Sequence, residues 1–324
     1  MAAPRMGYLC LSENPSNEAG RALIRQFVLV REAERMGYDD IWLGELHFDP
    51  QWPQGASHAM LGYMAAVTNK SRIGAMVCQP ALHEPIRLAE DVATLDLLSK
   101  GRFGLGVASG GAFPKALAVH GLTPETARAR MHDNLDKALA LLSGEAALPG
   151  DTGLSLYPLP SQSPVPVWMA CDDEAGIRLA AQKGWGLMAA ATHTFERVER
   201  ATSLYKAASG GRAPQLMLAR FASTAATREE ALAIARPYFD TFATRSLAEG
   251  WGQDRSRSIA QDVDALLAES LIGSHAEVAA QFKAIGLRYG ATGIAIVPTS
   301  AQFDTHKHIL ADFVDEIRPM LDED

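Results

Sequence analysis

A carboxylate and an imidazole lie close together in the segment Gly44-Glu45-Leu46-His47-Phe48. Histidine exchanges a proton near neutral pH, and a neighbouring carboxylate can orient its ring or share that proton. The segment therefore predicts acid–base chemistry, with Glu45 and His47 as the candidate catalytic residues. The alternative is an ordinary loop in which His47 bonds only to backbone groups.

Two further segments contain residues suited to holding an anion. Ala108-Ser109-Gly110-Gly111-Ala112-Phe113-Pro114-Lys115 contains paired glycines, whose backbone amides can converge on a negative charge. Ala170-Cys171-Asp172-Asp173-Glu174 leads into a helical pattern, and a helix N-terminus also attracts anions. The alternatives are a plain tight turn for the first segment and a helix cap from Asp172 or Asp173 for the second.

A strand-like run ends in the segment Ala75-Met76-Val77-Cys78-Gln79-Pro80. Small or apolar side chains at a strand end can press on one face of a flat ring system. An ordinary buried strand end is the alternative, and hydrophobic periodicity does not distinguish the two.

The elements that must position these segments are short strand-like runs alternating with longer helical patterns, which is typical of βα units around a parallel sheet. We expect strands over Met6 to Ser12, Ile41 to Gly44, Arg72 to Cys78, Phe103 to Ala108, Val165 to Ala170, Gly186 to Ala190, Gln215 to Ser223 and Gly293 to Val297. These units, with no glycine-rich phosphate turn after the first strand, favour an α/β fold of the (β/α)8 TIM-barrel type over a doubly wound sheet. No linker divides the chain, so residues 1–324 are expected to form a single domain.

In such a barrel the active site lies at the mouth, on the loops that follow the C-terminal ends of the strands. The candidate segments all follow predicted strands, so we expect them to meet there. Two insertions, Gly144 to Ser163 and Ala248 to Ile272, interrupt the alternation and are expected to lie at the mouth and shape a substrate pocket.

The composition argues against several classes of protein and site. Lys and Arg total 30 against 38 for Asp and Glu, and the net charge of -8 would repel a nucleic acid. Cys10, Cys78 and Cys171 are widely spaced and lack a Cys-x-x-Cys pattern, so neither disulfides nor a metal site is expected, and a reducing cytoplasm fits best. No signal-peptide pattern and no apolar run of about 18 residues occurs, so no membrane partner is expected.

A further set of segments, spread over nearly the whole chain, carries a family resemblance. They are Gly37-Tyr38-Asp39-Asp40-Ile41-Trp42-Leu43-Gly44-Glu45 with His47-Phe48, Ser71-Arg72-Ile73-Gly74, Glu84-Pro85-Ile86-Arg87-Leu88-Ala89-Glu90-Asp91, Leu95-Asp96-Leu97-Leu98-Ser99-Lys100-Gly101-Arg102, Phe103-Gly104-Leu105-Gly106-Val107, Ile272-Gly273-Ser274 and Gly290-Ala291-Thr292-Gly293. In this order and spacing they resemble the bacterial-luciferase-like flavin-dependent monooxygenases. The resemblance implies a barrel that binds reduced FMN, supplied by a separate flavin reductase, and activates oxygen at the flavin C4a position to oxidise a small organic substrate.

The resemblance also implies roles for individual residues. His47 would donate or accept a proton near the flavin, and the end of the third strand, at Ala75 and Met76, often holds a non-prolyl cis peptide against the isoalloxazine. The expected cofactor-binding residues are Ala75, Met76, Val77, Ser109, Gly110, Gly111, Lys115, Ala170, Cys171, Asp172 and Asp173.

Three positions depart from the family pattern. Leu46 stands where many relatives have the first of two histidines, and Ser109 stands where an arginine often binds phosphate. Asp172 and Asp173 replace a Gly/Ser-rich turn, and each would repel a phosphate by ~1 kcal/mol per close pair. Lys115 is expected to replace the charge that Ser109 does not supply, with a solvated surface lysine as the alternative.

Two functional classes remain open from the sequence. The first is an active enzyme, either the FMN-dependent monooxygenase or a deazaflavin-dependent oxidoreductase, and the second is a non-catalytic barrel subunit. A homodimer is expected through the helices after the second and third strands, because the helix over Ser57 to Thr68 has more apolar side chains than one inward stripe needs. The alternative is that loops of the same chain bury them.

Overall fold

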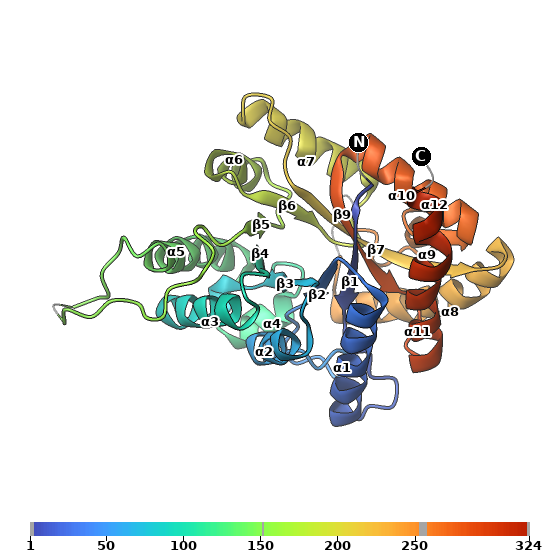
Figure 1. The fold of residues 1–324 in the computed structure, drawn as a ribbon, viewed down its shortest axis with the longest axis horizontal. Coiled ribbons are helices and arrows are strands. Elements are labelled where there is room, and N and C mark those ends of the chain that lie inside the picture. Colours follow the sequence, from blue (N-terminus) through green and yellow to red (C-terminus); the bar gives the residue numbers. More distant parts are fainter. Residues whose placement is uncertain (1–2, 151, 253–257, 323–324) are drawn as a thin grey trace.

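The computed structural model describes residues 3–150, 152–252 and 258–322 of the chain. Its strands form a closed parallel barrel (Figure 1). Each strand of the ring pairs with the next, and β6 closes onto β7. The strands of the ring are β1 (Arg5–Cys10), β2 (Asp40–Leu43), β3 (Arg72–Cys78), β4 (Phe103–Val107), β5 (Val167–Met169), β6 (Gly186–Ala189), β7 (Leu216–Ala225) and β9 (Ala291–Pro298). The predicted (β/α)8 barrel is confirmed.

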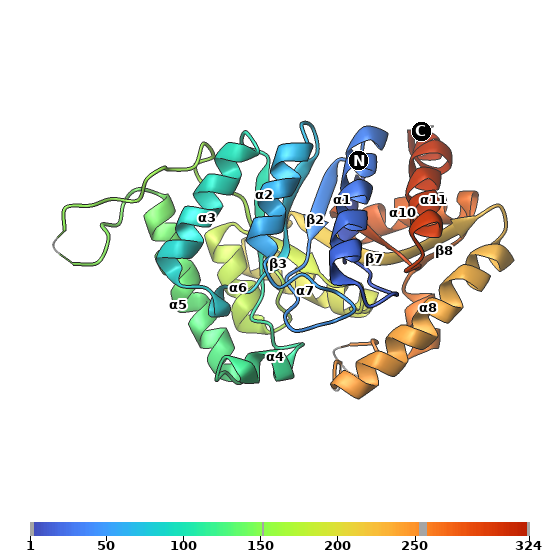
Figure 2. The same cartoon turned by 90° about the horizontal axis from the view of Figure 1, so that it is seen from below.

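Helices surround this ring, as Figures 1 and 2 show from two directions. Those that return the chain from one strand to the next are α1 (Ala19–Met36), α2 (Ser57–Val67), α3 (Pro85–Leu98), α5 (Pro124–Leu142), α6 (Glu174–Lys183), α7 (Phe195–Ala208) and α10 (His275–Tyr289). After β9 the chain ends in α11 (Phe303–Asp312), the π-helical turn η2 (Phe313–Ile317) and α12 (Arg318–Asp322). Among the described residues, no helix is long and apolar enough to cross a membrane.

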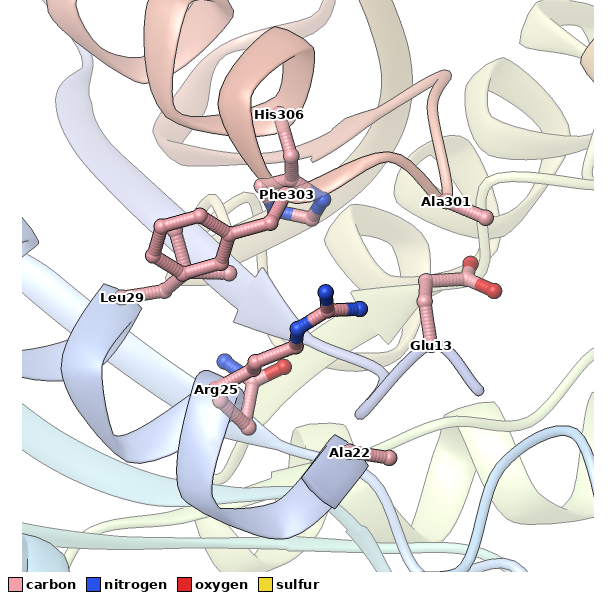
Figure 3. Close-up of a pocket in the computed structure, with 8 residues that line it drawn as sticks. Glu13, Ala22, Arg25, Leu29, Ala301, Phe303 and His306 are labelled. Carbon is pink, nitrogen blue, oxygen red and sulfur yellow. The ribbon is translucent and has the colours of Figure 1, made fainter. Parts of the chain in front are cut away.

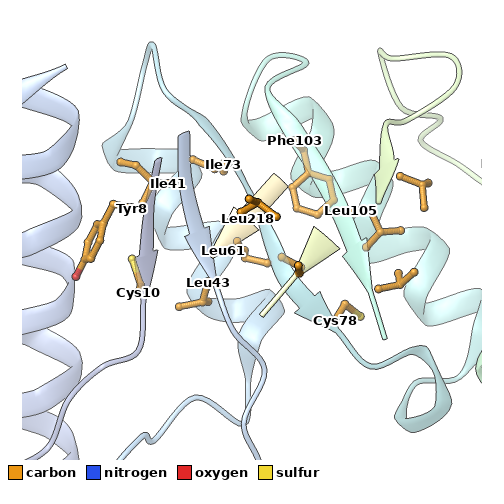
Figure 4. Packing of buried hydrophobic residues seen from close by; sticks show 14 of the residues in the cluster. Tyr8, Cys10, Ile41, Leu43, Leu61, Ile73, Cys78, Phe103, Leu105 and Leu218 are labelled. Carbon is orange, nitrogen blue, oxygen red and sulfur yellow. The ribbon is translucent and has the colours of Figure 1, made fainter. Parts of the chain in front are cut away.

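Side chains on the strands alternate between two buried layers. Ile41 and Leu43 point outward beneath the helices, in the layer that Figure 4 shows, whereas Trp42 points into the barrel. Inside, Trp42 packs edge to face against Trp168 with ring centroids 5.6 Å apart. Gly104 makes room for this pair, since a Cβ there would lie 2.9 Å from the Trp168 ring. Because both faces of each strand are buried, the strands read as almost continuous apolar runs.

Four short elements were not predicted as separate units. The helical turn η1 (Pro80–Leu82) precedes α3, and α4 (Pro114–Val119) follows β4. After α8 (Arg228–Glu249), the short helix α9 (Val263–Ala268) leads into β8 (Leu271–Ser274), which pairs with the outer end of β7 at Ala222 to Ala225 and lies outside the ring.

The helix α8, with Trp251 just after it, covers the mouth of the barrel. Tyr238 of α8 donates a hydrogen bond to Glu13, which follows β1, and Arg245 forms an ion pair with Asp49, which follows β2. Trp251 stacks on Trp52 from the loop after β2, at a centroid distance of 5.4 Å. The described part of the insertion Ala248 to Ile272 therefore begins at the mouth, as expected.

The other insertion lies at the opposite end of the barrel. Ser161 and Gln162 bind the carboxylate of Asp96, near the end of α3, and Gln162 also donates to the carbonyl of Phe103, the first residue of β4. Of the residues before them, those that the structure describes project past α3 and α5 (Figure 1). The expectation that Gly144 to Ser163 crosses the mouth was therefore wrong. This segment connects a helix to the next strand, and such connections return to the N-terminal ends of the strands.

Candidate active site

Glu45 lies two residues after the end of β2 and is buried, with only 3% of its surface exposed. Its Oε1 atom lies 2.7 Å from Nε2 of His47 and 2.9 Å from Nε2 of His83, and its Oε2 atom accepts from the backbone amide of Gln79 at 3.0 Å. Burial alone would raise the pKa of Glu45, but the hydrogen bonds of the two histidines outweigh it and lower the pKa to about 2. The carboxylate is thus a fixed negative charge that orients two imidazole rings.

The structure places His47 beside Glu45, in the loop that follows β2. An ionised carboxylate only accepts hydrogen bonds, so Nε2 of His47 carries the proton that points at Glu45. Nδ1 is then the ring atom left to exchange a proton with a ligand. The rings of His47 and His120 lie 5.9 Å apart, edge to face, on the same side of the site.

His83 completes this group and was not predicted as a site residue. It lies between η1 and α3, and its pKa is raised above the usual value, because the hydrogen bond and the charge of Glu45 outweigh the effect of burial. His83 stands 38 residues from Glu45 in the chain, so only the pairing of β2 with β3 brings the two together.

The end of β3 lies next to Glu45, as the sequence predicts. The peptide bond between Met76 and Val77 is a non-prolyl cis bond, at the strand end where the resemblance implies one. Ala75 is buried beneath the helices, whereas Met76 packs in the barrel interior. Gln79, just beyond, donates to the carbonyl of Glu45 at 2.9 Å and so ties this strand end to the histidine pair.

The loop after β4 presents a turn with free backbone amides. Gly110 has a φ of 75°, and a Cβ there would lie 2.0 Å from Oε1 of Gln79, so both the backbone and the neighbouring side chain require glycine. Within the described residues, the amides of Ser109, Gly110 and Gly111 have no hydrogen-bond partner. This turn is therefore able to bind an anion through its backbone.

Lys115 lies at the start of α4, and its ammonium is already engaged. Nζ lies 3.0 Å from Oε2 of Glu249 and 3.3 Å from the carbonyl of Ala248, both at the end of α8. Both side chains of the ion pair are largely exposed, so the pair contributes at most about 1 kcal/mol. A role for Lys115 at a phosphate requires it to leave Glu249.

The loop after β5 corrects one expectation from the sequence. Asp172 forms a 2.6 Å ion pair with Arg197 of α7, and Asp173 caps α6 by accepting from the amide of Gly176 at 2.9 Å. Arg128 of α5 approaches Asp173 at 3.9 Å. The two carboxylates are therefore not an uncompensated negative pair, because arginines distant in sequence balance them.

Cys171 and His193 line a hollow beside Arg197, between β5, β6 and α7. Burial, with the charges of Asp173 and Asp172, raises the pKa of the Cys171 thiol to about 12, so it is a poor nucleophile. Burial and the neighbouring charges of Arg197 and Arg220 lower the pKa of His193 well below its usual value. Ala170, beside Cys171, directly follows β5, and its backbone amide donates a hydrogen bond to the carbonyl of Val107 in β4 at 2.8 Å.

Glu13 is a second candidate acid–base group that the sequence did not reveal. It follows β1 and lines a hollow with Arg25, Phe303 and His306, which Figure 3 shows. Burial raises the pKa of Glu13 to about 7, although the hydrogen bond from Tyr238 acts in the opposite direction and lowers it. A carboxyl that titrates near neutral pH is suited to proton transfer. No local motif marks Glu13, since its burial results from α8 folding over it.

Comparisons with known proteins identify the family of this barrel. The sequence matches the family model of the luciferase-like monooxygenases over residues 5–292. A curated relative, the uncharacterized protein y4wF of Sinorhizobium fredii, is 28% identical over 204 residues, which span 60% of this chain and 59% of that protein.

Two solved structures share the fold over nearly the whole chain. The oxygenating constituent of 3,6-diketocamphane monooxygenase from Pseudomonas putida, a type II Baeyer-Villiger monooxygenase in complex with FMN, has a TM-score of 0.79 and 18% identity, covering 98% of this chain and 99% of that chain. A secondary alcohol dehydrogenase dependent on coenzyme F420, in complex with an F420-acetone adduct, has a TM-score of 0.74 and 18% identity, with the same coverage. At this identity the two structures establish the fold alone. Because the family model matches most of the sequence, the chain belongs to the luciferase-like monooxygenase family.

Proposed function

We propose that this protein is a two-component monooxygenase, which uses reduced FMN and oxygen to oxidise a small organic substrate. The observation that carries the proposal is the buried Glu45 carboxylate, which orients His47 at the barrel mouth beside the end of β3. Membership of the luciferase-like monooxygenase family supports it.

The described residues fit a flavin mononucleotide. The segment Ala75 to Val77 would contact the isoalloxazine, since it ends β3 next to Glu45. The free amides of Ser109 to Gly111 would bind the phosphate. The loop after β5 lies beside this turn, because Val107 pairs with Met169, and the ion pair of Asp172 with Arg197 limits the repulsion there.

When bound, the reduced flavin would supply the two electrons with which one oxygen atom enters the substrate and the other leaves as water. Glu45 keeps the His47 ring in one orientation, with its Nε2 proton held at the carboxylate. Nδ1 of His47 then takes up or releases a proton at the mouth. The covering helix α8 limits the access of water to this region, because Tyr238 and Arg245 anchor it to the loops after β1 and β2.

The flavin would arrive as a loosely held co-substrate from a separate flavin reductase. Backbone amides form most of the proposed phosphate site, and Lys115, the one predicted cation on that loop, is held by Glu249. Weak binding suits a cofactor that is exchanged with another protein in each cycle.

An anaerobic titration with oxidised and reduced FMN tests this proposal, followed by turnover with NADH and a generic flavin reductase under isotope-labelled oxygen. We expect preferential uptake of reduced FMN and label in the product from one member of a panel of small organic compounds. The variants Glu45→Gln and His47→Gln should lose turnover, whereas His120→Gln, which changes a neighbouring ring without a bond to Glu45, should retain it.

The same titration decides between the proposal and its alternatives. Tight binding of reduced coenzyme F420, with hydride transfer and no oxygen uptake, would instead support a deazaflavin-dependent oxidoreductase. If neither cofactor binds, the protein is a non-catalytic barrel subunit and the proposal is wrong.

A further inference from the structure

Three potential metal ligands meet between the barrel and its outer helices. Cys78 is the last residue of β3, His58 lies in the first turn of α2, and His83 precedes α3. The ligand atoms of the three residues lie within 4.8 Å of one another, and Sγ of Cys78 is 3.6 Å from Nε2 of His58. In a tetrahedral zinc site, sulfur and nitrogen ligands are about 3.5 Å apart, given Zn–S and Zn–N bonds of about 2.3 and 2.0 Å.

Each of the two histidines is held by a carboxylate on one ring nitrogen. Nδ1 of His58 lies 3.0 Å from Oδ2 of Asp91, and Nε2 of His83 lies 2.9 Å from Oε1 of Glu45. Because a carboxylate accepts hydrogen bonds, these nitrogens carry the ring protons. In the neutral rings, Nε2 of His58 and Nδ1 of His83 keep their lone pairs. Histidines that bind metal ions are fixed by outer carboxylates in the same way.

We propose that Cys78, His58 and His83 bind a zinc-like divalent cation, with Asp91 and Glu45 orienting the two imidazoles. On binding, Cys78 releases its thiol proton and coordinates as the thiolate, while both histidines coordinate through lone pairs and no electron is transferred. One thiolate and two imidazoles suit zinc better than calcium or magnesium, which prefer oxygen ligands.

Coordination requires a modest movement of the ligands. Where a pair is 4.8 Å apart it must close by about 1 Å, and the side chain of His83, which is 22% exposed, has room to turn. The ion would link the end of β3 to the starts of α2 and α3, next to Glu45. Its test does not depend on the proposed flavin chemistry.

A different chemical interpretation of the same residues is a Cys–His–Asp nucleophile. Cys78 has 0% of its surface exposed, so its sulfur cannot reach a substrate carbonyl without opening the fold. A bare metal ion needs far less space, and both histidines lie partly open to solvent. The burial of the sulfur therefore favours the metal site.

The experiment is a cobalt titration of tag-free, chelator-treated protein, without flavin. Cobalt bound to a thiolate gives a sulfur-to-metal charge-transfer band, so the spectrum reports the ligand directly. We expect this band to saturate at about one equivalent of cobalt and to be displaced by zinc, which binds more tightly. Zinc should also raise the unfolding temperature of the unmodified protein, since it binds only the folded site.

The other two cysteines provide the matched controls. The double variant Cys10→Ser with Cys171→Ser leaves Cys78 as the only thiol and should keep the band, whereas Cys78→Ser should lose it. Asp91→Asn keeps the shape of the orienting side chain and should weaken cobalt binding roughly 10- to 100-fold.

The proposal is overturned if the unmodified protein shows no thiolate band, or if the band disappears in the double variant and persists in Cys78→Ser. If cobalt binds without the thiolate charge-transfer band, it is an adventitious ion only, bound elsewhere on the protein, and the proposed site is wrong. Should Cys78→Ser fail to fold, the unmodified protein and the double variant still decide the question, because both keep Cys78.

Discussion

Glu13 should make the stability of this protein fall as the pH rises toward neutrality. In an unfolded chain its carboxyl ionises near the usual pKa of 4.5, whereas burial in the folded protein raises the pKa to about 7. Between these values the folded state binds the additional proton, so raising the pH favours unfolding. Each pKa unit corresponds to about 1.4 kcal/mol, and the loss is therefore roughly 3 kcal/mol, complete above about pH 7.

The variant Glu13→Gln isolates this effect. The glutamine keeps the acceptor for the Tyr238 hydroxyl, which donates to Glu13 at 2.8 Å, and it removes the titrating charge. Arg245, which also faces Glu13, keeps its ion pair with Asp49. We expect the variant to match the unmodified protein at about pH 5 and to exceed its free energy of unfolding by up to roughly 3 kcal/mol at about pH 8.

Urea unfolding at the two pH values measures this difference, followed by tryptophan fluorescence, since Trp52 lies beside Glu13 and Arg245. Other groups titrate in the same range, including the buried His306, but they are common to both proteins and cancel in the comparison. Glu18→Gln, at an exposed glutamate of the same loop, should show no such change. A stability difference for Glu13→Gln that is equal at both pH values would refute the reasoning.

Three further predictions concern the cofactor site and the surface. Replacing His47 with Ala should lower turnover about 10²- to 10⁴-fold and leave the urea midpoint nearly unchanged, as expected for a partly exposed proton-transfer group. If the variant is mostly unfolded and the fraction that does fold turns over normally, His47 has a structural role only. Lys115→Ala should weaken the binding of FMN more than the binding of phosphate-free riboflavin. Glu249→Gln, which frees the Lys115 ammonium, should strengthen the binding of FMN, and this gain should depend on the salt concentration. Equal binding of the two flavins by the unmodified protein would contradict this. Finally, sedimentation at micromolar concentration should show a homodimer that the variant Tyr63→Glu dissociates. Tyr63 on α2 and Leu98 on α3 are 45% and 56% exposed, and the two helices are neighbours. If the protein sediments as a monomer, these are ordinary surface residues.

The predicted dimer surface is smaller than the sequence suggests. Met60, Leu61 and Met64 of α2 are buried in the hydrophobic core, so they form the inward stripe of that helix and not a free surface. Tyr63 remains half exposed and packs against Phe27 of α1, with ring centroids 4.1 Å apart. Apolar content counted along one helix overstates an interface, because it does not show which neighbouring helices already cover it.

The sequence by itself determined the barrel and the location of its working end. Alternating strand-like and helical patterns are local properties, so they predict βα units directly. Because successive βα units make the strands parallel, every strand-to-helix loop lies at the same end of the barrel. Glu45, His47 and the end of β3 were predicted together for that reason. Each lies on such a loop or strand end.

Only the tertiary structure decided which side chains meet. His83 reaches Glu45 across the β2–β3 pair, and Arg197 of α7 pairs with Asp172 in the loop after β5. Cys78 lies beside His58 although no spacing in the sequence indicates a metal site. The same holds for Glu13, whose pKa depends on α8 closing over the mouth. Contacts of this kind depend on how segments distant in the sequence pack against one another, and a local pattern of residues does not specify that packing.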